Sequence, residues 1–165
     1  MENNGTTFAV KKIADSAFAQ RAELTNVVVE EGITTIGYSA FRGSGLTSVK
    51  FPSTVTYVGI AAFRDSYALN TVDFNGCTAE IDAEAFIGTA IEELTIPETV
   101  MLKGWTNFGW CPQLRTVVMT NMNQTAHHDV FKACGKLETA VLPKVDIMTG
   151  GYLVDCPSLR RVTFL

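Results

Sequence analysis

Cysteines are the residues of this 165-residue chain best suited to chemistry, and three of the four recur at a regular interval. Cys111, Cys134 and Cys156 occupy the same place in successive stretches of 22 or 23 residues, whereas Cys77 falls outside the series. Repeated thiols of this kind form a column in the interior, where cysteine behaves as a small apolar side chain. Three parallel thiols cannot all pair, so we expect free thiols rather than disulfides.

Other residue types with catalytic or metal-binding potential are poorly arranged for it. The pair His127-His128 is adjacent in sequence, so the two imidazoles diverge, and the chain has no C-x-x-C. Cys134 follows His128 by six residues, but a buried thiol is a poor nucleophile. The pairs Glu30-Glu31 and Glu92-Glu93 also point in different directions, which suits solvated carboxylates better than an acid–base pair. Because G-x-S-x-G and phosphate-binding glycine loops are missing too, we expect no catalytic residue, no metal site and no cofactor.

The composition indicates a packed globular chain. It is 47% hydrophobic and 18% charged, with a net charge of −4 and a pI near 5.1. Its cations are scattered, which argues against a nucleic-acid partner, and no run of 18 apolar residues is present to span a membrane. The N-terminal stretch MENNGTTFAV lacks the basic start and apolar core of a signal peptide. We expect residues 1–165 to form a single domain.

An internal repeat sets the positions of these residues. An aromatic residue, mostly within the dipeptide "AF", recurs every 22 or 23 positions: Phe18, Phe41, Phe63, Phe86, Phe108 and Phe131, with Leu153 in seventh place. Five or six residues later comes an aliphatic column: Leu24, Leu46, Leu69, Ile91, Leu114, Leu137 and Leu159. Two further columns follow at three and five positions beyond it: Val27, Val49, Val72, Leu94, Val117, Ala140 and Val162, then Val29, Phe51, Phe74, Ile96, Met119, Leu142 and Phe164. Each unit therefore reads L-x-x-V-x-F.

This unit predicts two extended segments and a turn. The V-x-F spacing of two places both residues on one face of a strand, and a proline ends the strand in three units, at Pro52, Pro97 and Pro143. A second extended segment carries its own apolar column at Ile13, Ile36, Val58 and Ile81. The following "xxAF" segment is predicted to be one helical or 3₁₀ turn. In this alignment Lys103 and Ala126 occupy the Ile81 column, so we expect less regularity between residues 100 and 129.

The pattern L-x-x-V-x-F-P followed by V-x-x-V/I-G-x-x-A-F resembles the BspA-like leucine-rich repeats, from about Val10 to Leu165. The resemblance implies a right-handed leucine-rich-repeat superhelix of about seven units, with a strand on the concave face and extended segments and turns on the other side. It also implies a cell-surface or secreted location and a role in adhesion to host proteins or other cells. The family's cysteine position is matched by the three repeated cysteines, with Ser66, Gly43 or Ser44, Gly88 or Thr89, and Arg21 in the remaining units.

The outward residues of the strand column are the expected ligand face, since the concave sheet of a solenoid is its usual binding surface. The expected binding residues combine small hydroxyls, few charges and valines: Lys50, Thr71, Asp73, Thr95, Thr116, Val118, Thr139 and Val141. This composition suits a broad protein contact, and it is equally that of a plain β-rich surface.

The sequence therefore predicts a protein-interaction module and not an enzyme, and the resemblance implies that its role is adhesion to a host surface or matrix protein. A structural spacer that presents other domains is the alternative, and a β-solenoid hydrolase is a weaker one because no acidic cluster marks a sheet. The final unit, LRRVTFL, ends within a strand, so we expect either a longer array or self-association through an exposed apolar edge at Val162–Phe164.

Overall fold

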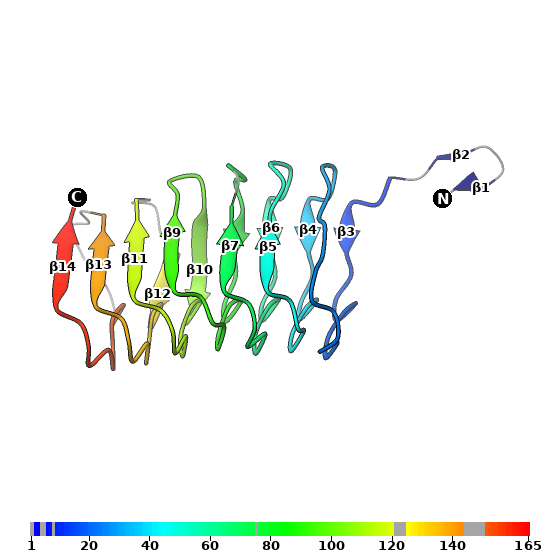
Figure 1. Cartoon of the computed structure of the whole chain (residues 1–165). Coiled ribbons are helices and arrows are strands. Elements are labelled where there is room, and N and C mark those ends of the chain that lie inside the picture. The colour runs from blue at the N-terminus through cyan, green and yellow to red at the C-terminus, as the bar shows by residue number, and fades with distance from the viewer. Residues whose placement is uncertain (1, 4–5, 8, 75, 121–124, 144–150) are drawn as a thin grey trace.

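A computed structural model of the chain describes all residues except 1, 4–5, 8, 75, 121–124 and 144–150, and it describes only the backbone of residues 2–3, 6–7 and 125–127. The chain winds into a solenoid of stacked coils, and successive coils add parallel strands to two opposing layers (Figure 1). A short antiparallel pair, β1 (Glu2–Asn3) and β2 (Thr6–Thr7), precedes the stack. Within the described residues no segment forms a helix.

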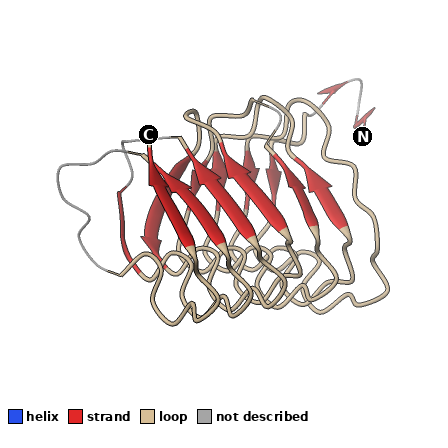
Figure 2. Cartoon of the chain, turned by 60° about the vertical axis from the view of Figure 1, so that its left-hand side comes forward, coloured by secondary structure: helices blue, strands red, loops and turns tan. Residues whose placement is uncertain are grey.

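Strands of the L-x-x-V-x-F motif form one layer, called here the front face (Figure 2). They are β5 (Ser48–Lys50), β7 (Thr71–Asp73), β9 (Glu93–Ile96), β11 (Thr116–Met119), β13 (Thr139–Leu142) and β14 (Arg161–Phe164). The second extended segments form the rear sheet: β3 (Lys12–Ile13), β4 (Thr35–Ile36), β6 (Tyr57–Val58), β8 (Glu80–Ile81), β10 (Met101–Trp105) and β12 (Thr125–His128). The predicted two-segment unit is confirmed.

The register of the front face follows the predicted columns. Val49 pairs with Val72, and Val117 pairs with both Leu94 and Ala140. All of these are buried except Val72, which is half-buried. Inward and outward positions are therefore assigned correctly along the face, since a shift of one residue would have inverted them all.

An aromatic ladder runs through the core between the two layers. Phe63 stacks between Phe41 and Phe86, with ring centroids 5.2 and 5.1 Å away and nearly parallel planes. The ladder continues through Phe108 to Phe131, and all five rings are fully buried. Offset-stacked rings add a specific attraction to the burial of their area, so each coil is held mainly by its two neighbours.

The segment around each ladder aromatic is a double turn, and the expected helical or 3₁₀ turn is wrong. Residues with positive φ recur four apart around the ladder phenylalanine, as at Ala61 and Asp65, and this breaks a helical path. Every second amide points to the next coil instead of back along its own turn: the Phe63 amide donates to the Ala85 carbonyl at 2.8 Å and the Asp65 amide to Ile87 at 2.8 Å. Hydrogen bonding between coils therefore replaces the helical pattern.

In the coil around β10 the structure differs from the predicted alignment of the Ile81 column. Leu102, not Lys103, pairs with Ile81 and is buried, while the Lys103 side chain reaches out to Glu80 at 2.5 Å. The cause is the spacing to the ladder phenylalanine, which is six positions for Leu102 and Phe108 but five for Ile81 and Phe86. The pairing of β10 with β12 also shifts register between Gly104 and Trp105. This shift agrees with the irregularity expected in this part of the chain.

The same register shift displaces the other residue assigned to that column. On the backbone, Ala126 pairs with Gly104 and not with Lys103, and its side chain lies outside the described residues. The extra residue of the coil is fixed by the buried Asn107, whose amide nitrogen donates to the Lys103 carbonyl at 2.8 Å and the Asp82 carbonyl at 3.0 Å.

Candidate functional site

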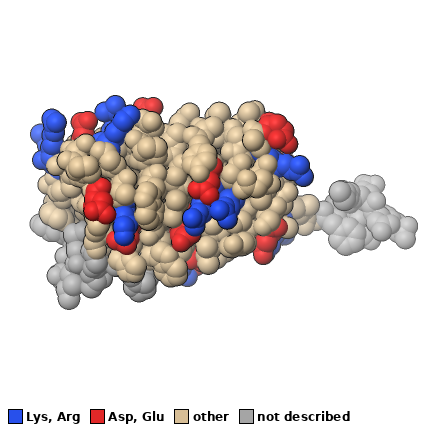
Figure 3. Space-filling model, turned by 90° about the horizontal axis from the view of Figure 1, so that it is seen from below, with Lys and Arg blue, Asp and Glu red and all other residues tan. Residues whose placement is uncertain are grey.

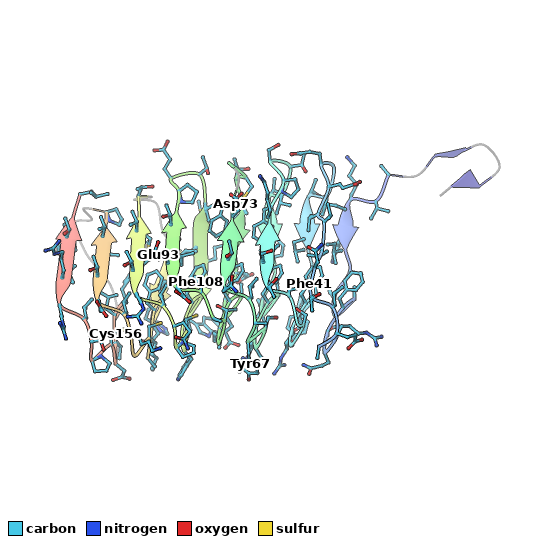
Figure 4. The ribbon with its side chains drawn as sticks, viewed as in Figure 1. Phe41, Tyr67, Asp73, Glu93, Phe108 and Cys156 are labelled. Carbon is cyan, nitrogen blue, oxygen red and sulfur yellow. The ribbon has the colours of Figure 1, made fainter. Side chains whose placement is uncertain are left out.

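The front face presents the predicted binding residues in two rows. Lys50 lies opposite Asp73, and Thr95, Val118 and Val141 continue this row on β9, β11 and β13. Thr71, Thr116 and Thr139 form the neighbouring row, with Glu93 between the first two. The fold thus brings these residues onto one surface, and Figure 4 shows Asp73 and Glu93 on this layer.

Exposure divides this face into two parts. Lys50, Thr71, Asp73 and Thr95 are exposed, whereas Thr116, Val118, Thr139 and Val141 are half-buried. The predicted exposure of Val118 and Val141 is thus met only in part, because each valine is flanked by paired residues on both neighbouring strands. The first part also carries Val28, whose side chain is 75% exposed.

The front face carries few charged residues, and some of them form ion pairs with each other. Lys50 Nζ lies 3.5 Å from Asp73 Oδ2, and both side chains are largely exposed. Arg115 and Glu138 form a similar pair at 3.2 Å. Exposed pairs of this kind contribute little to stability because water screens them, so they remain available to a partner.

Two shallow depressions lie on this face. One of about 390 Å³ is lined by residues 26–29 with Glu31, Ser48, Lys50 and Pro52. The other, of about 320 Å³, is lined by Asn70, Thr71, Val72, Glu92 and Glu93. Both are open, and neither brings together a nucleophile and a base. Open depressions of this kind fit a broad protein contact better than an enclosed small-molecule site.

The repeated cysteines form the predicted interior column and are free thiols. Cys111 and Cys134 are buried and Cys156 is half-buried near the end of the stack (Figure 4). The Cys111 thiol and burial together raise the pKa of Cys134, and burial raises the pKa of Cys156. Cys77 is buried as well, and burial raises the pKa of its thiol. Thiols in this state are weak nucleophiles.

Each repeated thiol has a structural partner. Cys111, Cys134 and Cys156 donate to the carbonyl oxygens of Phe86, Phe108 and Phe131, at 3.2 to 3.4 Å. In an earlier coil Ser66 makes the corresponding bond to Phe41, so the position requires a small donor. The family cysteine position left open at residues 43–44 and 88–89 is occupied by Ser44 and Thr89, which are both buried.

Among the described residues no group of three His, Cys, Asp or Glu side chains is placed to hold a metal ion. His128 is exposed and lies 3.5 Å from Asp129 through its Nδ1, while the side chain of His127 lies outside the described residues. In the same part of the chain, no helix has the length and apolarity needed to cross a membrane.

A second surface, which was not predicted from the sequence, lies at the lower edge of the solenoid in Figure 4. Tyr67 projects there with 72% of its side chain exposed, and Trp110 is also exposed. The signal was present in the spacing between the aromatic and leucine columns. This spacing is six residues for Phe63–Leu69 and Phe108–Leu114, but five for the coil between them, Phe86–Ile91.

Comparisons with known proteins agree with this architecture. The family model described as a BspA type leucine rich repeat region matches residues 11–138 in six copies. No curated protein matches the sequence. Among solved structures, a leucine-rich repeat protein from Eubacterium ventriosum is similar over 93% of this chain and 58% of its own, with 18% identity and a TM-score of 0.60.

Two further solved structures are similar. The pneumococcal vaccine antigen PcpA matches 94% of this chain and 60% of its own, with 16% identity and a TM-score of 0.55. A leucine-rich cell surface protein from Faecalibacterium prausnitzii matches 98% and 58%, with 20% identity and a TM-score of 0.45. The chain thus spans less than two thirds of the length of each of these structures.

Proposed function

Because the chain belongs to the BspA-type leucine-rich repeat family, we propose that it is an interaction module whose front face binds a protein partner. The observation that carries the proposal is the exposed row Lys50, Asp73 and Thr95, which continues into half-buried valines. It provides a surface with an apolar part, few charges and many hydroxyl groups. Protein interfaces combine an apolar centre with a polar rim in this way.

The proposed setting is a cell surface or the extracellular space, with adhesion to a host surface or matrix protein as the role. Support comes from the family and from PcpA, a solved relative by fold that is described as a vaccine antigen. A module of this kind needs no catalytic group, and its buried thiols serve the core. Solenoids bind through extended surfaces because each coil contributes a short row of side chains.

The test is adhesion of the purified protein to epithelial cells and to matrix-coated plates. Thr95→Lys places a charge in the middle of the front face, and Thr99→Lys places the same charge in an exposed turn of the same coil. We expect the first variant to weaken adhesion at least tenfold and the second to leave it unchanged, with both folded. Equal adhesion of the two variants, or no adhesion of the parent protein, would overturn the proposal.

We also propose that the β14 edge supports contact between two copies of this chain. Val162, Phe164 and Leu165 are exposed there and form an apolar edge beside strand backbone. Exposed strands with apolar side chains readily pair with other chains. Sedimentation should show a concentration-dependent dimer that Phe164→Lys abolishes and Phe18→Lys, at the other end of the stack, preserves. A monomer at all concentrations would refute this contact.

A further inference from the structure

The lower edge of the solenoid has a groove that is built by loop length. In the coils of Tyr67 and Pro112 the leucine position follows the ladder aromatic by six residues, and these two side chains project outward. In the coil between them the spacing is five residues, so this coil is recessed at Ala90. The groove above the recessed coil has a volume of about 420 Å³, and its floor includes Ile87 and Gly88. Its volume lies within the range of small-ligand sites.

Two exposed aromatic side chains stand on opposite sides of this groove. Tyr67 belongs to the coil before the recessed one and Trp110 to the coil after it, and both line the groove. Successive coils are about 5 Å apart, as the ring centroids of Phe63, Phe86 and Phe108 show at 5.1 and 5.0 Å. Tyr67 and Trp110 are two coils apart and are therefore separated by roughly twice that distance. This leaves room for one ligand ring between them, with its atoms at contact distances of roughly 3.5–4.0 Å from each aromatic side chain.

The charges at the groove cancel in pairs. Arg64 pairs with Glu84 and lies 3.6 Å from Asp65, and Arg42 lies 3.2 Å from the same Asp65 oxygen. Figure 3, a view of this edge, shows acidic and basic side chains interspersed. Arg64, Asp65 and Glu84 line the groove, and Arg42 of the adjacent groove neutralises the remaining negative charge. A charged ligand therefore gains little from long-range attraction. The remaining lone pairs and N–H groups of these side chains can still bond hydroxyl groups.

We propose that this groove binds a saccharide unit of a neutral glycan. A pyranose ring offers C–H groups that pack on aromatic rings, and hydroxyls around its rim that bond carboxylates and guanidinium groups without adding charge. Tyr67 and Trp110 contact the faces of the ring, and Asp65, Glu84 and Arg64 contact its hydroxyls. The site is separate from the front face, so it is tested independently of protein binding there.

A second, similar groove gives the site room to extend along the edge. On the other side of Tyr67, the coil in which Leu46 follows Phe41 by only five residues is recessed at Gly45. A groove of about 480 Å³ lies above this coil. Tyr67 and Asp65 line both grooves and so stand between two adjacent subsites. A chain of linked saccharides can therefore occupy both, which predicts tighter binding of longer oligosaccharides.

The experiment is calorimetric titration of the folded protein with cellohexaose, maltohexaose, laminarihexaose and N-acetylchitohexaose. At least one should bind with a Kd of about 1 mM or tighter, and its affinity should not change with added salt. Trp110→Ala and Tyr67→Ala should each weaken that binding at least tenfold. Trp105→Ala is the matched control, since Trp105 is as exposed as Trp110 but does not line the groove, and it should bind normally.

A second variant tests the architecture itself. Insertion of one alanine between Thr89 and Ala90 gives the recessed coil the length of its neighbours and fills the groove, so binding should be lost while adhesion through the front face persists. The proposal is overturned if none of the four hexasaccharides binds, or if binding survives both aromatic substitutions. It is also overturned if only heparin, a chitosan hexamer or a proline decamer binds in their place.

Discussion

The hydroxyl of Ser66 donates a 2.9 Å hydrogen bond to the backbone carbonyl of Phe41, one coil earlier, and both residues are fully buried. The same hydroxyl lies 3.2 Å from that of Ser44. Later coils make the equivalent bond with a cysteine thiol. The column, which carries hydroxyls in the earlier coils and thiols in the later ones, therefore satisfies backbone carbonyls beside the aromatic ladder.

Ser66→Ala should cost about 1–2 kcal/mol of unfolding free energy, because it removes one buried hydrogen bond and leaves the Ser44 hydroxyl without this partner. Ser66→Cys should cost less, since a thiol makes the same bond in other coils. Denaturant unfolding measures both. The double variant Ser44→Ala/Ser66→Ala should cost less than the sum of the single variants, and strict additivity would contradict the coupling.

Phe63→Ala should cost about 3–5 kcal/mol, since it opens a cavity between two stacked rings in a fully buried ladder. Phe18 is the matched control, because among the described residues it stacks only on Phe41, and it is 41% exposed. Phe18→Ala should therefore cost clearly less. Equal denaturant midpoints for the Phe63→Ala and parent proteins would show that the aromatic ladder does not stabilise the stacked coils.

The columns of this solenoid were predictable from the sequence because their residues repeat the same physical requirement. Val49, Phe63 and Leu94 are buried for reasons of spacing and hydrophobicity, which a linear pattern records directly. The turns were not predictable in this way. Ser39, Ala61 and Glu84 adopt positive φ although their types rarely do so, since hydrogen bonds from the neighbouring coil stabilise a conformation that local preference disfavours.

The candidate sites also combine features that could be predicted from the sequence with features that could not. Lys50 and Asp73 could be placed on one surface from the strand period alone, whereas Lys103 was misplaced because one extra residue shifted the register of its coil. The groove at Tyr67 depends on the length difference between adjacent loops, which becomes a shape only when the coils are stacked. No column of similar residues marks such a site.

Charge reversal at Lys50 or Asp73 should leave stability almost unchanged while weakening the front-face contact. The pair is 3.5 Å apart and largely exposed, so a double-mutant cycle with Lys50→Glu and Asp73→Lys should give a coupling below about 1 kcal/mol. Thermal unfolding and cell adhesion are measured on the same samples. Parallel loss of both properties would mean that the two residues serve the fold and not a partner.

Tyr57 on the rear sheet predicts a change in stability at high pH. Its hydroxyl donates a 2.7 Å hydrogen bond to Asp82 Oδ2, and burial, with this bond and the nearby carboxylates, raises the pKa of Tyr57 to about 12. The unfolded chain releases this proton near pH 10, whereas the folded chain retains it to about pH 12. The contribution of Tyr57 to stability is therefore fully present below pH 10 and decreases as the pH rises from 10 to 12.

Tyr57→Phe isolates this effect. The variant should be about 1 kcal/mol less stable at neutral pH because the bond to Asp82 is lost. Its disadvantage relative to the parent protein should shrink as the pH rises from 10 to 12, since phenylalanine does not ionise in either state. Urea unfolding at a series of pH values measures the difference, and phenolate absorbance follows the titration in the folded protein. A constant difference over this range would show that Tyr57 ionises in the folded chain as it does in the unfolded one.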